Sequence, residues 1–345
     1  MKKLTYLVSA IAAAFTANSY ADVSVSGSLG AGYVNDVNGD GNVVNSGTVS
    51  FGLSTTTANG MTVSGSLGLS VSPTSENGAT GTGGQQITFA TGGSTITVGD
   101  IAIADQPGSV GGVAGAATVE HGNFDMDVAS GFADDDGNGV SLSTSVAGST
   151  VSLGYIFDTD GNSVSDITNS TKAATAFGVS VPMGAYTVSA GFASHDDGHE
   201  ASGASVSAAM GAGTLTVGYS SQTMTEDTSA VTGAGAYSFN TTSGLAVRAT
   251  PAVSSASADD ADAAGDTTVM GATYVLALDA DTSVSLGYQN KKDADDDQQT
   301  QFDLAISRSL GGGASVYMDM RSLSGDAEAA GGDGTSFGFG TSVSF

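Results

Sequence analysis

Carboxylate and amide oxygens clustered between apolar segments are the groups of this sequence best placed to bind a ligand. Asp36, Asn38 and Asp40 occupy alternate positions, and Asp158 and Asp160 repeat part of the pattern before another glycine. Oxygen ligands at alternate positions of one loop are typical of Ca²⁺ sites. The twelfth position of the first loop is Gly instead of the Glu of a helix-loop-helix calcium site, and no flanking helices are predicted. Weak Ca²⁺ binding and ordinary turn formation by Asp, Asn and Gly are both open at this point.

The three histidines do not indicate a catalytic or metal site. His195 and His199 share an acidic loop, where no helix would place both imidazoles on one side. His121 falls on an expected strand, but no serine is recognisably paired with it as a nucleophile beside its base. The chain has no cysteine, which excludes thiol chemistry and disulfides. We therefore expect no enzyme, and the sequence requires no cofactor.

A further set of charged residues alternates with apolar neighbours, which places it on the polar face of extended strands. Arg308 is the exception, because it shares a face with Phe302, Leu304 and Ile306. It lies near a turn at Gly311, where a long side chain can reach out of an apolar layer. The residues predicted on the polar face are Glu120, Asp125, Asp127, Arg248, Asp303, Asp319 and Arg321.

The elements that position these groups are strands, because apolar and small polar residues alternate through most of the chain. After the turn dipeptide Asn59-Gly60, residues 61–72 place Met, Val and Leu on one face and Thr and Ser on the other. Similar segments at 95–100, 150–155, 187–192, 214–219 and 283–288 each follow a short turn, and four of the five end in an aromatic residue. Their unequal spacing disfavours a solenoid, and no linker divides the chain into two sandwich domains.

The N-terminus and the overall charge indicate an exported, acidic protein. Residues 1–21 combine two lysines, an apolar run and small residues at a cleavage site, which is typical of a secretory signal peptide, so the fold begins near Asp22. Without that segment the chain keeps 35 acidic and six basic residues, a net charge of −29. Such a charge disfavours nucleic acid as a partner. No later apolar run could form a membrane helix, so a membrane protein with this sequence must be a closed barrel.

Residues 335–345 form the most regular of the alternating segments. Phe337, Phe339, Val343 and Phe345 fall on one face, while glycines and serines take the other. A final strand of this kind that ends on Phe resembles the assembly signal of Gram-negative outer-membrane β-barrels. The glycine-rich turn at 311–313 is similar to the last periplasmic turn of trimeric general porins.

The resemblance implies a fold, a location and partners. It implies an all-β protein in which residues 22–345 form an antiparallel transmembrane β-barrel of the outer membrane, with short periplasmic turns and long outer loops. It also implies surrounding outer-membrane lipid, a homotrimer, and recognition of the C-terminal strand by the barrel-assembly machinery. General porins have about 16 strands, whereas alternating long and short connections give 20 here, so we expect an even number from 16 to 20.

One long connection, residues 101–116, carries little charge. It follows the fifth predicted strand, the position from which general porins fold a loop into the barrel. In those porins the loop narrows the pore, and the resemblance implies by position that Asp105 and Gln106 line this constriction here. The alternative is that residues 101–116 form an ordinary outer loop. In the family an acidic loop faces arginines on the wall, but only Arg248 and Arg321 could supply them here. We therefore expect a lining of carboxylates, Ser and Thr.

These features predict a water-filled pore for passive diffusion of small hydrophilic solutes and ions. A preference for cations is expected, because acidic residues outnumber arginines in the predicted lining. A secreted, calcium-stabilised β-rich adhesin or surface-layer protein is one alternative, suggested by the Asp-Gly loops. A substrate-specific channel with a wider barrel is another, favoured if the strand number exceeds 16.

Overall fold

A computed structural model describes residues 22–35, 41–71, 80–82, 86–102, 136–157, 173–195, 200–224, 237–239, 247–249, 265–292, 298–325 and 334–345. The regular elements in these ranges are strands, and none of the described segments is a helix long and apolar enough to span a membrane. The strands are β1 (Asp22–Asn35), β2 (Gly41–Thr56), β3 (Thr62–Val71), β4 (Thr80–Thr82), β5 (Gln86–Thr91), β6 (Ser94–Ala102), β7 (Asp136–Val146), β8 (Ser149–Ile156), β9 (Ala174–Met183), β10 (Tyr186–His195), β11 (Glu200–Met210), β12 (Gly213–Met224), β13 (Tyr237–Phe239), β14 (Val247–Ala249), β15 (Gly265–Ala277), β16 (Thr282–Lys292), β17 (Gln298–Gly311), β18 (Ala314–Gly325) and β19 (Gly334–Ser344).

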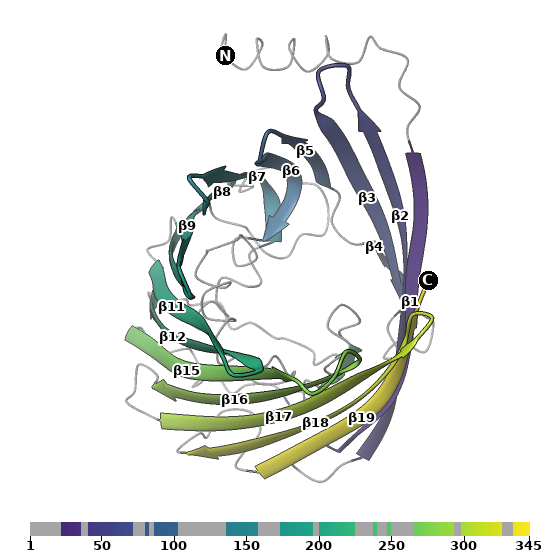
Figure 1. Ribbon diagram of the computed structural model, residues 1–345, viewed down its shortest axis with the longest axis vertical. Coiled ribbons are helices and arrows are strands. Elements are labelled where there is room, and N and C mark those ends of the chain that lie inside the picture. Colours follow the sequence, from purple (N-terminus) through teal and green to yellow (C-terminus); the bar gives the residue numbers. More distant parts are fainter. Residues whose placement is uncertain are drawn as a thin grey trace, which may run out of the picture.

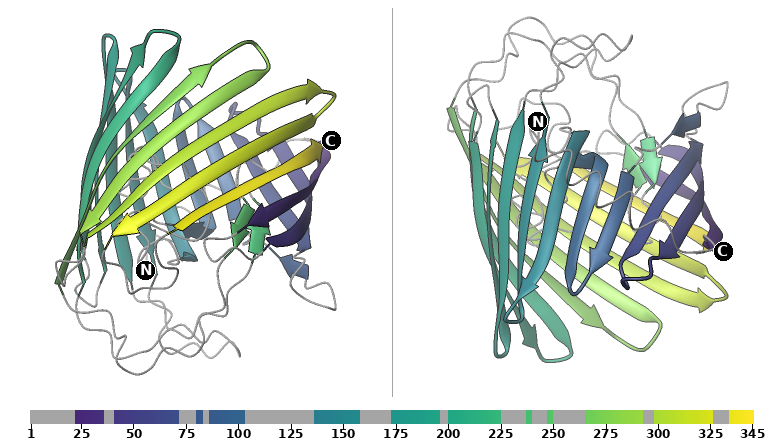
Figure 2. Two further views of the ribbon diagram at one scale, coloured as in Figure 1. Left: turned by 90° about the horizontal axis from the view of Figure 1, so that it is seen from below. Right: turned by 90° about the horizontal axis from the view of Figure 1, so that it is seen from above.

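In the described part of the chain, one antiparallel sheet closes into a barrel with sixteen strand positions (Figures 1 and 2). The sheet has 17 strands, and β1 pairs with both β2 and β19. β4 and β5 pair with different stretches of β3, so the two short strands share one position in the ring. Closure leaves no edge strand, and backbone groups are paired within the wall, as a membrane interior requires.

Side chains alternate between the two faces of the wall. On β17, Phe302 points outward and is 42% exposed, whereas its neighbours Gln301 and Asp303 point inward and are 2% and 0% exposed. Exposed Leu286 and Tyr288 continue the outer face on β16. An apolar outer band with a polar interior fits lipid outside the barrel and water inside it.

Tight turns join neighbouring strands at one end of the barrel. Gly311, Gly312 and Gly313, between β17 and β18, have φ angles of 79°, 61° and 80°. Glycine adopts this left-handed conformation without a Cβ clash, which explains why three glycines follow one another there. The predicted Asn-Gly turn between β2 and β3 is also present, with φ of 79° at Gly60.

The alternative count of 20 strands is wrong, because two predicted hairpins do not enter the wall. β6 pairs directly with β7, so no wall strand lies between them, and the arms predicted around 117–132 lie outside the described residues. β12 likewise pairs directly with β15, while β13 and β14 form a separate two-stranded sheet. Alternation predicts an extended segment, but the pairing partner decides whether that segment joins the barrel.

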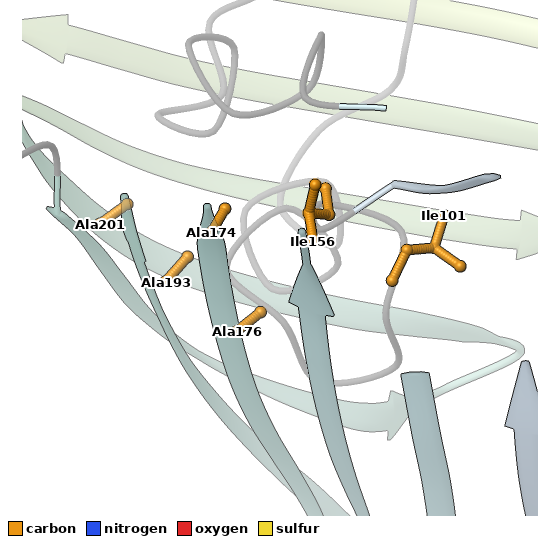
Figure 3. Packing of buried hydrophobic residues seen from close by; sticks show 6 residues of the cluster. All are labelled: Ile101, Ile156, Ala174, Ala176, Ala193 and Ala201. Carbon is orange, nitrogen blue, oxygen red and sulfur yellow. The ribbon is translucent and has the colours of Figure 1, made fainter. Parts of the chain in front are cut away.

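Alanine and isoleucine side chains cover one sector of the inner face. They come from β6 and from the neighbouring strands β8 to β11 (Figure 3). All are at most 4% exposed, so these side chains are not in contact with water. The residues are Ile101, Ile156, Ala174, Ala176, Ala193 and Ala201.

Candidate functional site

Hydroxyl and amide groups on β1, β2, β3 and β5 form an open part of the barrel interior. Ser54 lies opposite Ser64, which lies opposite Thr88, so one polar row crosses three neighbouring strands. These side chains are partly exposed, and Gln86 on the same wall is exposed. They border a cavity of about 330 Å³, whose lining contains no charged residue. Hydroxyls and amides both donate and accept hydrogen bonds, so this surface can replace part of the water around a hydrophilic solute. The lining residues are Ser24, Gly52, Leu53, Ser54, Ser64, Gly65, Ser66, Gln86 and Thr88.

A buried ion pair lies on the inner face of β17 and β18. Asp303 and Arg321 are directly opposite each other across the two strands. Arg321 Nε lies 3.5 Å from Asp303 Oδ1, and the two side chains are 3% and 0% exposed. Gln301 Nε2 donates to Asp303 Oδ2 at 2.6 Å. A buried charge is costly without a partner, so the guanidinium and the amide together hold this carboxylate in the wall.

The predicted pore-lining residues fall into three groups. Asp303, Asp319 and Arg321 are on the inner face, but all three are buried. Arg248 lies in β14 opposite Ser238 of β13, so its predicted place on a barrel strand is wrong. The others lie outside the described residues: Asp105, Gln106, Glu120, Asp125 and Asp127.

Burial and pairing change the expected electrostatics of the lining. Of the five acidic residues predicted on the inner face, only Asp303 and Asp319 belong to the described strands. The charge of Asp303 is balanced by Arg321 at 3.5 Å. Opposite charges this close produce little field beyond their own neighbourhood. The count of acids against arginines on the strands is therefore a poor guide to the potential in the lumen.

Arg308, the charged residue predicted on the outer face, reaches the turn between β15 and β16. Its Nη1 donates to Thr282 Oγ1 at 2.9 Å and lies 3.6 Å from Asp279 Oδ2. The backbone N–H of Asp281 and the hydroxyl of Thr282 donate to the Asp279 carboxylate, and these bonds, with the charge of Arg308, lower the pKa of Asp279. The guanidinium thus sits at the level of the turn, outside the apolar band, where its charge can be hydrated.

The C-terminal strand closes the barrel with its aromatic face outward. β19 pairs with β1, and Phe345 exchanges two backbone hydrogen bonds of 3.0 Å with Gly27. A Cβ atom at Gly27 would lie 2.6 Å from Phe345 Cζ, so the terminal ring covers this glycine. Phe337, Phe339 and Val343 are exposed on the same outer face. The residues predicted to form the assembly signal therefore share one outward surface at the closing seam.

The predicted calcium ligands and the predicted signal peptide are not among the residues that the structure describes. The ligands are Asp36, Asn38, Asp40, Asp158 and Asp160, and the peptide covers residues 1–21. Within the described ranges, no group of three His, Asp or Glu side chains could hold a metal ion. Calcium binding at the outer loops stays a prediction.

Sequence reasoning missed two features of the inner wall. Gln289 and Gln301 lie opposite each other on β16 and β17, and both are almost fully buried. Tyr317 is also buried, with its hydroxyl against the position that a Cβ atom of Gly340 would occupy. The alternation of side chains that places Asp303 and Asp319 inward also places Gln289, Gln301 and Tyr317 inward, so the sequence predicts the direction of these side chains. The sequence does not indicate that this part of the inner wall is shielded from water.

A family model described as Gram-negative porin matches residues 5–328. A comparison with curated proteins gives no match. A loop-deletion mutant of OmpT, an outer membrane protein of Vibrio cholerae, has a TM-score of 0.68 at 12% identity, over 94% of this chain and 99% of the other.

Two porin structures are similar as well. An anion-selective porin from Comamonas acidovorans has a TM-score of 0.63 at 14% identity, over 94% of this chain and 100% of its own. A porin refined at 1.8 Å has a TM-score of 0.60 at 18% identity, with the same coverage of 94% and 100%. These structures support the fold, whereas the family match spans nearly the whole chain. The protein therefore belongs to the Gram-negative porins, β-barrel proteins of the outer membrane.

Proposed function

We propose that this porin forms a water-filled channel for passive diffusion of small hydrophilic solutes and ions. The observation that carries the proposal is the open inner wall of β1, β2, β3 and β5, where hydroxyl and amide side chains border a cavity inside a closed barrel. Diffusion along such a wall needs no catalytic residue and no cofactor. A secreted adhesin is disfavoured, because it would present the apolar outer face to water.

The proposed preference for cations rests on the net charge of the chain. Without residues 1–21 the charge is −29, and acidic entrances concentrate cations and repel anions. The pair of Asp303 and Arg321 adds little, because its charges cancel. A similar porin is described as anion-selective, so the fold does not set the sign. At ~0.15 M salt the Debye length is about 8 Å, so the preference should decline as salt rises.

Conductance of the purified protein in a planar bilayer with a salt gradient tests both the diffusion channel and the cation preference. We expect discrete conductance steps and a reversal potential with the sign of cation selectivity, which becomes smaller at high salt. A silent membrane that contains inserted protein would contradict the diffusion channel. An anion-favouring potential would contradict only the cation preference.

We also propose that three copies associate through the outer face of β2 to β6. Outward aromatics such as Tyr155, Phe192 and Tyr288, near the ends of their strands away from the tight turns, mark an interfacial girdle. Among the described residues of β2 to β6 the aromatics are Phe51 and Phe89, both nearer the tight turns. An outer face without this aromatic girdle is consistent with contact with another copy of the protein instead of lipid. The trimeric state of general porins supports the same proposal. Conductance steps in threes and a heat-sensitive oligomer on an SDS gel are expected; a conducting monomer would contradict the trimer.

Two proposals concern outer segments outside the described residues. The connection after β6 starts at the fifth wall position, and we propose that Asp105 and Gln106 narrow the pore there; Asp105→Asn should then reduce the cation preference.

We propose weak Ca²⁺ binding by the Asp-rich loops, which would relieve repulsion among their carboxylates. An unchanged melting temperature on adding EDTA would contradict it.

The C-terminal strand is proposed as the segment that the barrel-assembly machinery recognises. Its support is the outward aromatic face of β19 and the position of Phe345 over Gly27 at the seam. Deletion of Phe345 should leave unassembled protein in the periplasm, while Thr341→Ser on the same outer face should not. Normal assembly of the deletion variant would contradict the proposal.

A further inference from the structure

Three buried oxygen atoms on the inner wall of β15 to β17 have no hydrogen-bond partner. They are Thr273 Oγ1, Gln289 Oε1 and Gln301 Oε1, and their side chains are 6%, 1% and 2% exposed. Buried polar atoms nearly always have a partner, and each that lacks one destabilises the folded protein. Three such atoms on adjacent strands indicate a shared occupant.

The register of the three strands arranges these atoms around Gly287 of β16. Thr273 on β15 and Asp303 on β17 lie directly opposite Gly287, one on each side. Gln289 and Gln301 lie opposite each other in the next row of inward positions. Neighbouring strands are about 4.8 Å apart, and glycine has no side chain to fill the space above it. A hydroxyl, a carboxylate and two amides therefore surround a position that no side chain of β16 fills, and this position is called the gap.

Two of the hydrogen-bond donors next to this gap are engaged by Asp303. Gln301 Nε2 donates to Asp303 Oδ2 at 2.6 Å, and Arg321 Nε lies 3.5 Å from Asp303 Oδ1. The oxygens available around the gap are two amide oxygens, a hydroxyl oxygen and the remaining lone pairs of the carboxylate. A set composed of oxygen ligands suits a hard cation. The set contains a single carboxylate, that of Asp303, and Arg321 offsets part of its charge, which favours a monovalent cation over a divalent one.

We propose that a dehydrated Na⁺ or K⁺ ion binds in the barrel wall above Gly287, coordinated by Thr273, Gln289, Gln301 and Asp303. The side chains that form this site are at most 6% exposed, so it is separate from the solute path along β1 to β5 and does not depend on the proposed diffusion function. The ion contacts side chains of three strands and stabilises that part of the barrel. The same oxygen chemistry serves both ions, and the experiment distinguishes them.

Thermal unfolding of the purified protein in NaCl, KCl or N-methylglucamine chloride, at equal ionic strength, tests the proposal. An ion at ten times its dissociation constant lowers the apparent unfolding constant about elevenfold by mass action. The melting temperature should therefore be higher in Na⁺ or K⁺, and the effect should saturate with concentration. In the Gln289→Leu/Gln301→Leu variant this advantage should disappear. Gln86→Leu, at an exposed glutamine of the same interior, is the matched control and should retain it.

A second variant keeps the test decisive if the double leucine variant does not fold. Thr273→Val removes one oxygen with little change of shape and should reduce the difference between the salts. Equal melting temperatures of the natural protein in all three salts would overturn the proposal and indicate that water fills the gap. A Na⁺ or K⁺ effect that is unchanged in the variants would also overturn it, because it would arise from the acidic surface. Channel conductance can be intact in either case, so failure here is distinct from failure of the diffusion channel.

Discussion

Removal of Arg321 is expected to be among the most destabilising changes in the barrel wall. Arg321 Nε lies 3.5 Å from Asp303 Oδ1, and the side chains are 3% and 0% exposed. Unit charges at that distance attract by about 5 kcal/mol at an effective dielectric constant of ~20. Removing one partner of a buried pair typically costs about 3–5 kcal/mol. We therefore expect Arg321→Met to lower the free energy of unfolding by about 3–5 kcal/mol.

A double-mutant cycle separates the ion pair from simple loss of packing. Asp303→Asn with Arg321→Met should cost about 1–3 kcal/mol less than the sum of the single changes, because each single change leaves a buried charge unbalanced. The chain contains no Trp, so urea unfolding is followed by far-UV circular dichroism and by mobility on unheated gels. Arg308→Met is the matched control: its side chain is 54% exposed, so it should cost less than ~1 kcal/mol. The reasoning is refuted if Arg321→Met costs no more than Arg308→Met, or if the two changes are additive.

Three further predictions concern the faces, the seam and the turns of the barrel. Leu286→Arg on the outer face should lower the free energy of unfolding by about 2–4 kcal/mol, whereas Ser307→Arg on the inner face should cost less than ~1 kcal/mol; equal costs in urea unfolding would contradict the assignment of the faces. Gly340→Ala would place a Cβ atom against the Tyr317 hydroxyl and should lower the free energy of unfolding by about 1–3 kcal/mol. If Gly340→Ala has the same effect in a protein that already carries Tyr317→Ala, contact with the hydroxyl is not the cause. The pKa of Asp279 is lowered, so the stability it contributes is complete above the ordinary value of 3.8 and is lost as pH falls through the folded pKa. Asp279→Asn should therefore flatten the decline of the melting temperature between about pH 5 and about pH 2, and an unchanged decline would contradict this.

Much of the architecture follows from local patterns. Phe337, Phe339 and Phe345 occupy alternate positions and therefore share one face of the last strand. This predicts which face points outward, because a strand has only two faces and one of them must contact lipid. The same alternation places Asp303 and Arg321 inward. The three glycines at 311–313 predict a tight turn, and each has the positive φ that glycine tolerates. In all these cases the relevant interactions lie within a few residues along the chain.

The strand count failed where the answer depends on distant partners. The segment with Arg248 alternates like a wall strand, yet β12 pairs with β15 and leaves β14 to pair with β13. An isolated alternating segment has no preference between a barrel neighbour and a local hairpin. Closure of the ring, in which every strand needs two partners, makes that choice.

The sequence by itself determined the class of this protein: an exported, acidic barrel with an apolar outer face and a polar inner one, closed by a C-terminal aromatic strand. Only the tertiary structure decided how many strands enter the wall, that Asp303 and Arg321 form a buried pair, and that Thr273, Gln289 and Gln301 surround Gly287. The physical reason is that side-chain parity is a property of one strand. Charge pairing, burial and ligand geometry arise from the register between strands, and that register is set only when the whole ring closes.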